Sequence, residues 1–467
     1  MNNNKNRISL LILLLAHLLT IVDIFIVNVA IPSIERGLGS TPSDIQLVVA
    51  MYMIGFASFL IIGGKAGDHY GRKRIFLLGM SFFMVSSALC GFAKTSEQLI
   101  VLRFFQGISA GLMSPQVLSY IQILFKTHKE RTYAIGWYGI AIGIGTMLGQ
   151  FLGGFLIELK PLIVNQSWRY IFLINIPICA ISIGFASQYL VESKDHSSVK
   201  MDYTSALILS IALVMLISAL TIGLNQSIYL LIVFLPTSLI LLLWFILRQK
   251  RRIKKQKQTL LNLELFKYRN FNMAVLAAAL FMLMLDAYFF ILAIFLQDGL
   301  RLTPMQAGFF IVFQGGGFVL ASLFSAKLVL RFGKAVLIFG VLVITSTLLL
   351  QLGLFYHKAM GFMGYIVMTF HGIGVALVLP SFANVALKGL PENMIGNASG
   401  VYSTLQQFFG ALGIALTGGL FYFALDGNSG IIHFYNAFLC ATVIHMTCLM
   451  GVLTILIRLP QSILSQK

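Results

Sequence analysis

The stretch from Ile8 to Ile31, ISLLILLLAHLLTIVDIFIVNVAI, decides the fold class of this chain. It contains no lysine, arginine or glutamate, and Asp23 is its one acidic residue. A helix of about 20 apolar residues crosses the roughly 30 Å hydrocarbon core of a bilayer. The stretch is too long for the core of a signal peptide, which has about 7–15 apolar residues. It therefore predicts a transmembrane helix that is retained in the protein.

The composition extends this prediction to the whole chain. Of the 467 residues, 58% are hydrophobic and 10% are charged, and the mean hydropathy is +0.90. A soluble domain has about a quarter of its residues charged, and so apolar a chain would expose large hydrophobic patches to water. Four cysteines lie scattered in hydrophobic runs without a C-x-x-C pair, so no disulfide framework, redox site or metal site is predicted. The chain is predicted to be an all-α integral membrane protein.

Hydrophobic runs of similar length recur along the sequence. Six fall within residues 1–192 and six within 259–467, which predicts two six-helix bundles. Two inserted transmembrane helices and a basic linker occupy residues 193–258, which gives 14 spans and places both termini on one side. Such a duplication is typical of transporters whose binding site lies between two halves. The runs begin near Ile8, Gln46, Ile75, Glu97, Tyr133, Tyr170, Tyr203, Ile228, Asn272, Gln306, Ala335, Phe362, Ser399 and Ala437.

Lysine and arginine are distributed unevenly between the two sets of loops. Of the 33 basic residues, Arg103 lies within a span, and six lie in loops that follow odd-numbered spans: Arg36, Lys94, Lys160, Arg169, Arg301 and Lys358. The remaining 26 lie in the other loops and the tails, and basic loops face the cytoplasm. The sequence thus predicts a cell membrane protein, of a bacterial inner membrane, with both termini cytoplasmic. The net charge of +18 then reflects topology and not nucleic-acid binding.

Three charged residues fall inside the predicted spans, namely Asp23, Arg103 and Asp286. A charge at mid-membrane costs between about 2.5 and 17 kcal/mol depending on the method, so such residues are functional candidates. With a rise of about 1.5 Å per residue, Asp23 and Arg103 lie about 12 Å and 9 Å below the outer surface and can pair. A carboxylate in a dehydrated site can exchange a proton for a cationic substrate. We therefore predict that these three residues couple protons, and that Asp23 and Asp286 also border a substrate cavity.

Three histidines also lie within predicted spans. We interpret each of them as a neutral histidine whose ring nitrogens are satisfied by a neighbour. They are His17, His371 and His445.

The loop after the second span reads GKAGDHYGRKR from Gly64 to Arg74. Asp68 and Arg72 are spaced to pair on one helix face, Gly64 is expected to permit close helix approach, and Gly71 to permit a tight turn. This loop resembles the G-x-x-x-D-x-x-G-R-K motif of the major facilitator superfamily. In that family the loop latches the two halves on the inner side, which implies a cytoplasmic gate of Gly64, Asp68, Gly71 and Arg72.

Further segments strengthen the resemblance. Leu102–Gly107 is similar to the family's R-x-x-Q-G motif, in which the arginine is tied to proton coupling. Val22–Pro32, VDIFIVNVAIP, resembles the D-x-x-I-V-N-V-A-x-P motif of the fourteen-helix drug:proton antiporter branch, and Trp168–Pro177 is typical of that branch. The resemblance implies the major facilitator fold, with Tyr52 and Gln106 among the residues that line the cavity. The fifth span resembles the antiporter motif of exporters at Gly149, Gln150, Gly153 and Gly154.

The chain also departs from the family's patterns. Gln150 stands where the antiporter motif usually has proline, and Leu47 stands where a tryptophan often precedes Tyr52. A second copy of the loop motif, from Ala326 to Gly333, has Leu330 at its acidic position. The inner latch is therefore expected to depend mainly on Asp68.

These observations predict a proton-coupled antiporter that exports amphipathic, cationic organic compounds by alternating access, as in multidrug efflux. No cofactor is expected besides the proton gradient, the expected partners are substrate, protons and lipid, and the expected state is a monomer. A proton-coupled uptake symporter and an exporter of one specific metabolite stay open on the same fold. An enzyme is not predicted, because no H-x-x-x-x-D, H-E-x-x-H, D-x-D or phosphate-binding loop occurs.

Overall fold

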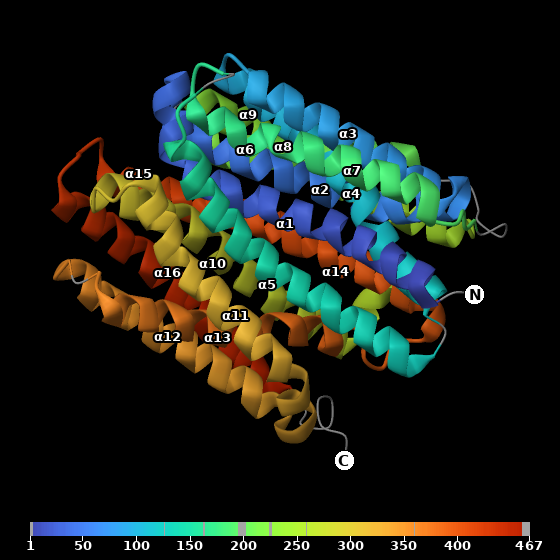
Figure 1. Cartoon of the computed structure of the whole chain (residues 1–467). Helices are drawn as coiled ribbons and strands as arrows, with labels where there is room; N and C mark the ends of the chain where they lie inside the picture. The colour runs from blue at the N-terminus through green and yellow to red at the C-terminus, as the bar shows by residue number, and fades with distance from the viewer. Residues whose placement is uncertain are drawn as a thin grey trace.

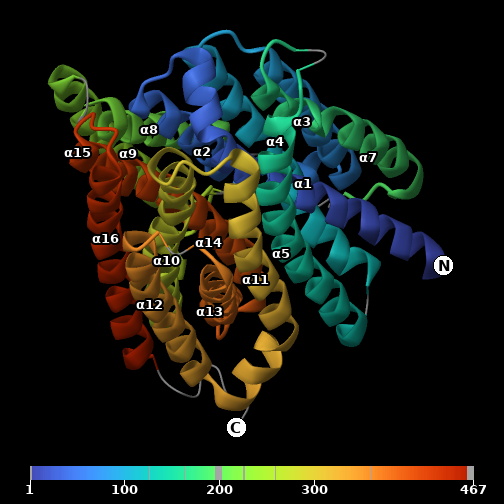
Figure 2. The ribbon, with the colours of Figure 1, turned by 60° about the vertical axis from the view of Figure 1, so that its left-hand side comes forward.

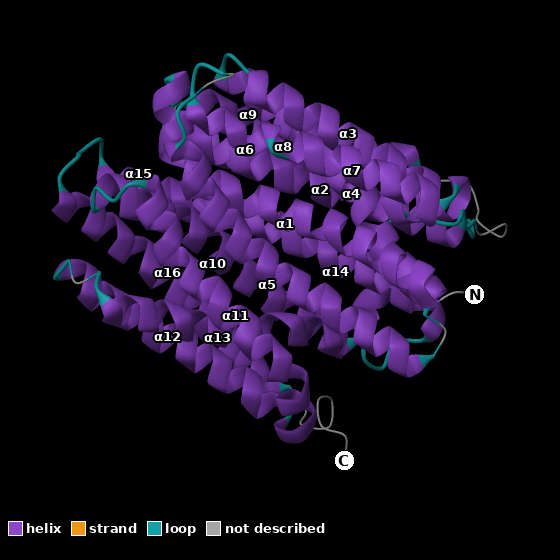
Figure 3. Ribbon diagram, in the orientation of Figure 1, coloured by secondary structure: helices purple, strands orange, loops and turns teal. Residues whose placement is uncertain are grey.

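The computed structural model describes residues 3–125, 127–161, 164–194, 202–223, 227–257, 259–358 and 360–459. Helices make up almost all of these ranges, and no strand occurs within them (Figure 3). The all-α prediction is confirmed.

The N-terminal bundle consists of the helices from α1 to α7. Thr41 begins α2 with a capping box, in which its hydroxyl accepts from the Asp44 amide while the Asp44 carboxylate accepts from the Thr41 amide. The helices are α1 (Asn3–Leu38), α2 (Pro42–Tyr70), α3 (Arg72–Phe92), α4 (Ser96–Leu124), α5 (His128–Glu158), the short η1 (Ser167–Arg169) and α6 (Tyr170–Leu173), and α7 (Asn175–Tyr189).

The C-terminal bundle consists of the helices from α10 to α16. It contains α10 (Arg269–Ile294) with η4 (Phe295–Gly299), α11 (Pro304–Phe332), α12 (Lys334–Tyr356), α13 (Phe362–Leu387), α14 (Glu392–Gly413) with η5 (Ile414–Gly418) and α15 (Gly419–Leu425), and α16 (Ile431–Arg458). Between the bundles run α8 (Tyr203–Ser218) with η2 (Ala219–Gly223), α9 (Ile228–Lys254) and η3 (Leu263–Lys267). Figure 1 shows the bundles side by side, with α1 beginning and α16 ending toward the same end of the array.

Thirteen helical segments in the described ranges are long and apolar enough to cross a membrane. The predicted span near Glu97 is also a helix, α4, and its 29 residues can cross a bilayer. Its hydropathy is lowered by buried polar residues, including Arg103, Gln106 and Gln116. The structure therefore contains the predicted fourteenth helix, although hydropathy alone does not identify it.

The two bundles repeat the same local features. Thr41 at the start of α2 and Thr303 at the start of α11 both form capping boxes. Gly71 and Gly333, which follow the same two helices, have positive φ values of 109° and 60°, and glycine adopts this conformation readily. This correspondence supports a duplicated architecture.

The bundles meet along two helix pairs, α5 with α11 and α2 with α14 (Figure 2). We call the end that carries the loops at Gly39 and Leu300 the predicted outer end, and the end that carries Gly71 and Gly333 the predicted inner end. Among the described residues, three polar contacts join the bundles at the predicted outer end. They are the Arg36–Asp298 ion pair at 3.0 Å, a hydrogen bond from Gln297 to the Val29 carbonyl at 2.8 Å, and one from the Met305 amide to Glu158 at 3.0 Å.

The bundles separate toward the predicted inner end. A Cβ on Gly154 would lie 2.5 Å from the Pro304 carbonyl oxygen, and one on Gly143 would lie 2.7 Å from Val319. Helices α5 and α11 therefore pack closely from the predicted outer end to the middle of α5. Gly139 and Gly136 lie on the same face of α5, one and two turns nearer the predicted inner end. A Cβ at either position would have no atom within 4 Å. The chain is therefore closed at one end between these helices and open at the other.

The inserted pair packs on one side of the assembly. Helix α8 contacts α2 and also α14, whereas the buried residues of α9 are Ser238, Phe245 and Gln249. Helix α9 thus presents most of its apolar surface outward, as a lipid-facing helix does.

Candidate functional site

Asp23 on α1 and Arg103 on α4 form an ion pair through Arg103 Nη1 and Asp23 Oδ2, and neither side chain is exposed. The structure therefore brings these two predicted site residues together. An ion pair that is withdrawn from water needs further hydrogen bonds to offset the loss of hydration. The neighbouring helices supply them.

The Asp23 carboxylate accepts two more hydrogen bonds. Gln106 Nε2 donates to Oδ1 at 2.8 Å, and Asn175 Nδ2 donates to the same oxygen at 3.1 Å. Asn175 also donates to the Ser87 hydroxyl at 3.0 Å. Helices α4 and α7 therefore bind the carboxylate of α1 directly, and Ser87 of α3 contacts it through Asn175.

Arg103 is held on several sides. Its Nη1 donates to Gln106 Oε1 at 2.8 Å, and its Nε donates to the Val48 carbonyl at 3.3 Å. The guanidinium carbon lies 4.3 Å from the centre of the Tyr52 ring, which is a cation–π geometry. Tyr52 in turn donates to the Thr20 carbonyl at 3.4 Å. Tyr52 and Gln106 are enclosed in this network and do not border an open cavity in this conformation, so their predicted role as cavity-lining residues remains a prediction.

Asp286 lies apart from this network, on α10 where the two bundles meet. It is 7% exposed, and its Oδ2 has no hydrogen-bond partner in the described chain. The carboxylate faces Gly410 on α14 and the methyl group of Met53 on α2, so a side chain at Gly410 would collide with it. An ionisable residue buried at the interface between the bundles is a candidate functional residue.

The loop motif at the predicted inner end forms a local ion pair. Arg72 Nη2 lies 2.7 Å from Asp68 Oδ1, and Gly71 makes the tight turn that the sequence predicted. The expectation for Gly64 is wrong, because a Cβ there would lie 3.6 Å from Pro115, an ordinary contact. The close approach of α2 to α4 occurs one residue earlier, at Gly63, where a Cβ would collide with the backbone of α4.

The antiporter motif lies where α5 meets α1 and α11. Gly149 and Gly153 pack on the backbone of α1, and Gly154 packs on α11. Gln150 is buried, and its side-chain amide has no hydrogen-bond partner among the described residues. Its backbone carbonyl oxygen lies against Gly308 of α11. Gln150 thus occupies the contact between the bundles, where the motif usually has proline.

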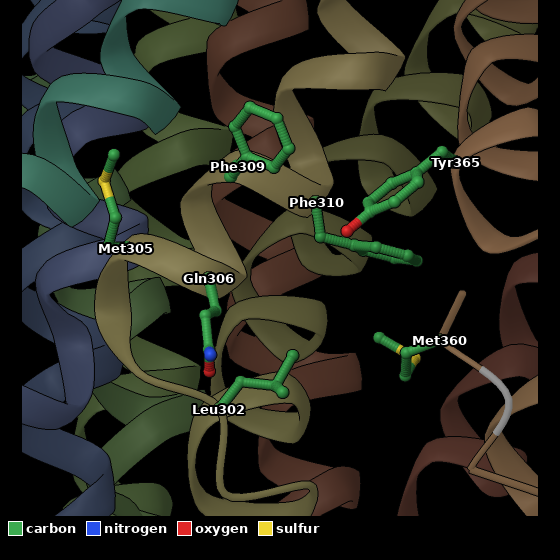
Figure 4. Close-up of a pocket in the computed structure, with 7 residues that line it drawn as sticks. All are labelled: Leu302, Met305, Gln306, Phe309, Phe310, Met360 and Tyr365. Carbon is green, nitrogen blue, oxygen red and sulfur yellow. The ribbon is translucent and has the colours of Figure 1, made fainter. Parts of the chain in front are cut away.

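Two pockets on the described surface lie elsewhere. One of about 360 Å³ opens at the predicted outer ends of α11 and α13, where Phe309, Phe310 and Tyr365 line it together with Met305 and Met360 (Figure 4). The other, of about 310 Å³, lies between α2, α4 and α8 and is almost wholly apolar. Neither pocket contains a predicted site residue.

Sequence reasoning missed several parts of this arrangement. Asn175 lies in the Trp168–Pro177 segment, from which no site residue is predicted, yet its amide donates to Asp23. The interpretation of the three histidines is also largely wrong. Nδ1 of His371 is hydrogen-bonded to Thr347, whereas both ring nitrogens of His17 and of His445 have no partner in the described chain.

A profile of the Major Facilitator Superfamily matches residues 13–201 and 203–414. A probable actinorhodin transporter of Streptomyces coelicolor is 30% identical over 90% of this chain and 73% of its own length. Multidrug resistance protein 3 of Bacillus subtilis is 30% identical over 87% of this chain and 78% of its own. The crystal structure of a D-xylose-proton symporter matches with a TM-score of 0.69 at 14% identity and covers 97% of this chain and 98% of that one, which shows a shared fold.

Proposed function

Because this chain belongs to the major facilitator superfamily, whose members are transporters and not enzymes, we propose that it is a proton-coupled antiporter that exports amphipathic, cationic compounds. The observation that carries this proposal is the buried network around Asp23. A proton on this carboxylate would break the ion pair with Arg103 and leave the guanidinium uncompensated in a dry bundle. Removing one partner of a buried pair costs about 3–5 kcal/mol, which is enough to drive a rearrangement.

Asp286 supports the choice of a cationic substrate. Its carboxylate lies unpaired between α10, α14 and α2, so an organic cation that reaches this interface would supply the missing opposite charge. The names of two relatives, a multidrug resistance protein and a probable actinorhodin transporter, support a small organic substrate.

The separation of α5 and α11 supports alternating access. With the termini cytoplasmic, as the loop charges predict, the contact between Arg36 and Asp298 closes the outer side and the open seam faces the cytoplasm. A substrate would enter there, and the exchange would be driven by about 1.36 kcal/mol per pH unit and about 2.3 kcal/mol per 100 mV for each charge moved.

The test uses purified protein in liposomes with an imposed proton gradient and a fluorescent lipophilic cation. Wild type is compared with Asp23→Asn and with Asp426→Asn. Asp426 is exposed, and its backbone adopts the left-handed helical conformation, which asparagine tolerates. This variant therefore controls for the loss of one carboxylate. Gradient-driven cation movement in wild type and in Asp426→Asn, with its loss in Asp23→Asn, is the expected result.

Two other outcomes separate the alternatives. Undiminished coupling in Asp23→Asn would overturn the role of Asp23 and leave Asp286 as the coupling carboxylate. No movement of the cation by the wild type would overturn cation export and favour an uptake symporter or an exporter of one specific metabolite.

A further inference from the structure

The C-terminal bundle contains a buried polar cluster that the proposed function does not use. It is built by α10, α12, α13 and α16, and its polar members are at most 4% exposed. We call it the C-terminal polar cluster. Its members are Tyr288, Thr347, Gln351, Met368, His371 and His445.

The hydrogen bonds of the cluster favour one tautomer of His371. The Thr347 hydroxyl lies 2.8 Å from the Ile344 carbonyl, to which it donates, and 2.9 Å from His371 Nδ1. With its hydrogen on the carbonyl, the hydroxyl oxygen accepts from Nδ1–H, and we assign this tautomer to His371. Its Nε2 carries a free lone pair and has no partner in the described chain.

Two imidazole rings bracket Tyr288. His371 stacks on the Tyr288 ring with centroids 4.7 Å apart, and His445 meets the same ring edge-on at 6.1 Å. The Tyr288 hydroxyl donates to Gln351 Oε1 at 2.9 Å. The cluster thus holds three unpartnered ring nitrogens among its buried side chains.

The repeat relates this cluster to the site in the N-terminal bundle. Gly107 on α4 packs on the Tyr52 backbone of α2, and Gly372 on α13 packs in the same way on the Gln314 backbone of α11. His371, just before Gly372, therefore occupies the place of Gln106.

One turn earlier on these two helices, Met368 occupies the place of Arg103. The C-terminal bundle therefore has the neutral thioether of Met368 where the N-terminal bundle has the charged guanidinium of Arg103. The imidazole of His371, which can acquire a charge, follows three residues later on the same helix.

We propose that the C-terminal polar cluster is a second proton-binding site, with His371 Nε2 as the acceptor and His445 as its neighbouring base. Its use in transport rests on the proposed function, whereas proton binding itself does not.

Two neighbours of His371 would offset part of the cost of charging a buried imidazole. On protonation the Thr347 oxygen continues to accept from Nδ1–H, and the face of the Tyr288 ring stabilises the charged imidazole. Among the described residues, the titratable members of the cluster besides His371 are Tyr288 from α10, which stacks on His371, and His445 from α16, which contacts the Tyr288 ring. Helix α12 contributes the neutral Thr347 and Gln351, and α11 contributes the Gln314 backbone.

The direct test is nuclear magnetic resonance of the ring nitrogens in ¹⁵N-histidine-labelled, purified protein, with and without tetraphenylphosphonium. The pH is lowered from about 8.5 to about 4.5, a range that brackets the ordinary titration of histidine. The signal that disappears in His371→Gln is expected to change from the neutral Nδ1–H form to the doubly protonated form. His371→Gln gives this position the same side chain as Gln106, its equivalent in the N-terminal bundle. The control is His357→Gln, which replaces an exposed histidine. A neutral Nδ1–H signal throughout, with and without the cation, overturns the proposal.

The second measurement is the number of protons exchanged per cation in liposomes. His371→Gln and His445→Asn are expected to exchange about one proton fewer per cation than wild type, while His357→Gln is unchanged. An unaltered ratio overturns the role in coupling. If the wild type shows no proton-driven transport, the proposed function fails, and the resonance experiment still decides whether the cluster binds a proton.

Discussion

Arg103 lies over the ring of Tyr52, with 4.3 Å between the guanidinium carbon and the ring centre, while the same group pairs with Asp23. Lysine carries the same charge, but one ammonium cannot stand in for both Nη1, which donates to Asp23 and Gln106, and Nε, which donates to the Val48 carbonyl. Each hydrogen bond to a charged group contributes about 1.5–3 kcal/mol. We therefore expect Arg103→Lys to reduce gradient-driven transport by about tenfold or more.

The measurement is the initial rate of cation movement in liposomes, at equal protein content. Arg331→Lys is the matched control, because Arg331 is exposed and lies over Phe332 at 5.1 Å. If Arg103→Lys remains within about twofold of wild type, the fork geometry is not required, and charge alone suffices.

Two glycines on the same face of α5, Gly154 and Gly139, are expected to respond differently to substitution by alanine. In Gly154→Ala the new methyl group would lie 2.5 Å from the Pro304 carbonyl oxygen, whereas in Gly139→Ala it would have no atom within 4 Å. Overpacking of this kind costs about 1–3 kcal/mol, and here it opposes the closed arrangement of the predicted outer end. We expect Gly154→Ala to slow transport by about fivefold or more and Gly139→Ala to be silent. Equal rates in the two variants would contradict the packing between α5 and α11.

Exchanging the charges of Arg36 and Asp298 is expected to restore the transport rate that a single charge reversal lowers. Their 3.0 Å ion pair joins the bundles at the predicted outer end, with side chains 62% and 22% exposed. Ion pairs this exposed contribute about 0–1 kcal/mol, so Arg36→Asp is expected to slow transport by about two- to fivefold. Arg36→Asp combined with Asp298→Arg should restore the rate, and high salt should reduce the difference. A double variant as slow as the single one would show that the pair does not act as a latch.

The sequence predicted the helical fold well, because the spans are long and their apolar content is strong. The position of α4 was predicted from its length even though Arg103, Gln106 and Gln116 lower its hydropathy. Depth along the helix also placed Asp23 and Arg103 in one layer, and the structure shows them in contact.

Contacts between distant helices were harder to predict. The role of Asn175 depends on which face of α7 is turned toward α1, and periodicity does not show this in a helix that is apolar on every side. The same holds for His371 and Tyr288, which come from different helices, and for the close approach at Gly63 in place of Gly64. In each case the missing information is the rotation of one helix against another.

Asp202, just before α8, ties the inserted pair together at the predicted inner end. Its Oδ1 lies 3.2 Å from Arg248 Nη2 and its Oδ2 2.9 Å from Arg252 Nε, both on α9. Burial favours the neutral carboxyl, but hydrogen bonds from Ser205 and Arg248 and the charge of Arg252 outweigh it and lower the pKa of Asp202. A lowered pKa means that the carboxylate stabilises the folded chain above the unfolded pKa, which is near 3.9, and that this stability is lost as the pH falls through the folded value.

Thermal unfolding of wild type and Asp202→Asn at a series of pH values measures this contribution. At pH 7 the variant leaves two arginines without their buried partner, so its midpoint should be lower. As the pH falls below about 3.9, protonation of Asp202 removes the same interaction from the wild type, and the two midpoints should converge. Asp426→Asn, at an exposed site, should follow the wild type throughout. A difference between wild type and Asp202→Asn that does not change with pH would mean that packing around Asp202, and not its charge, holds α8 to α9.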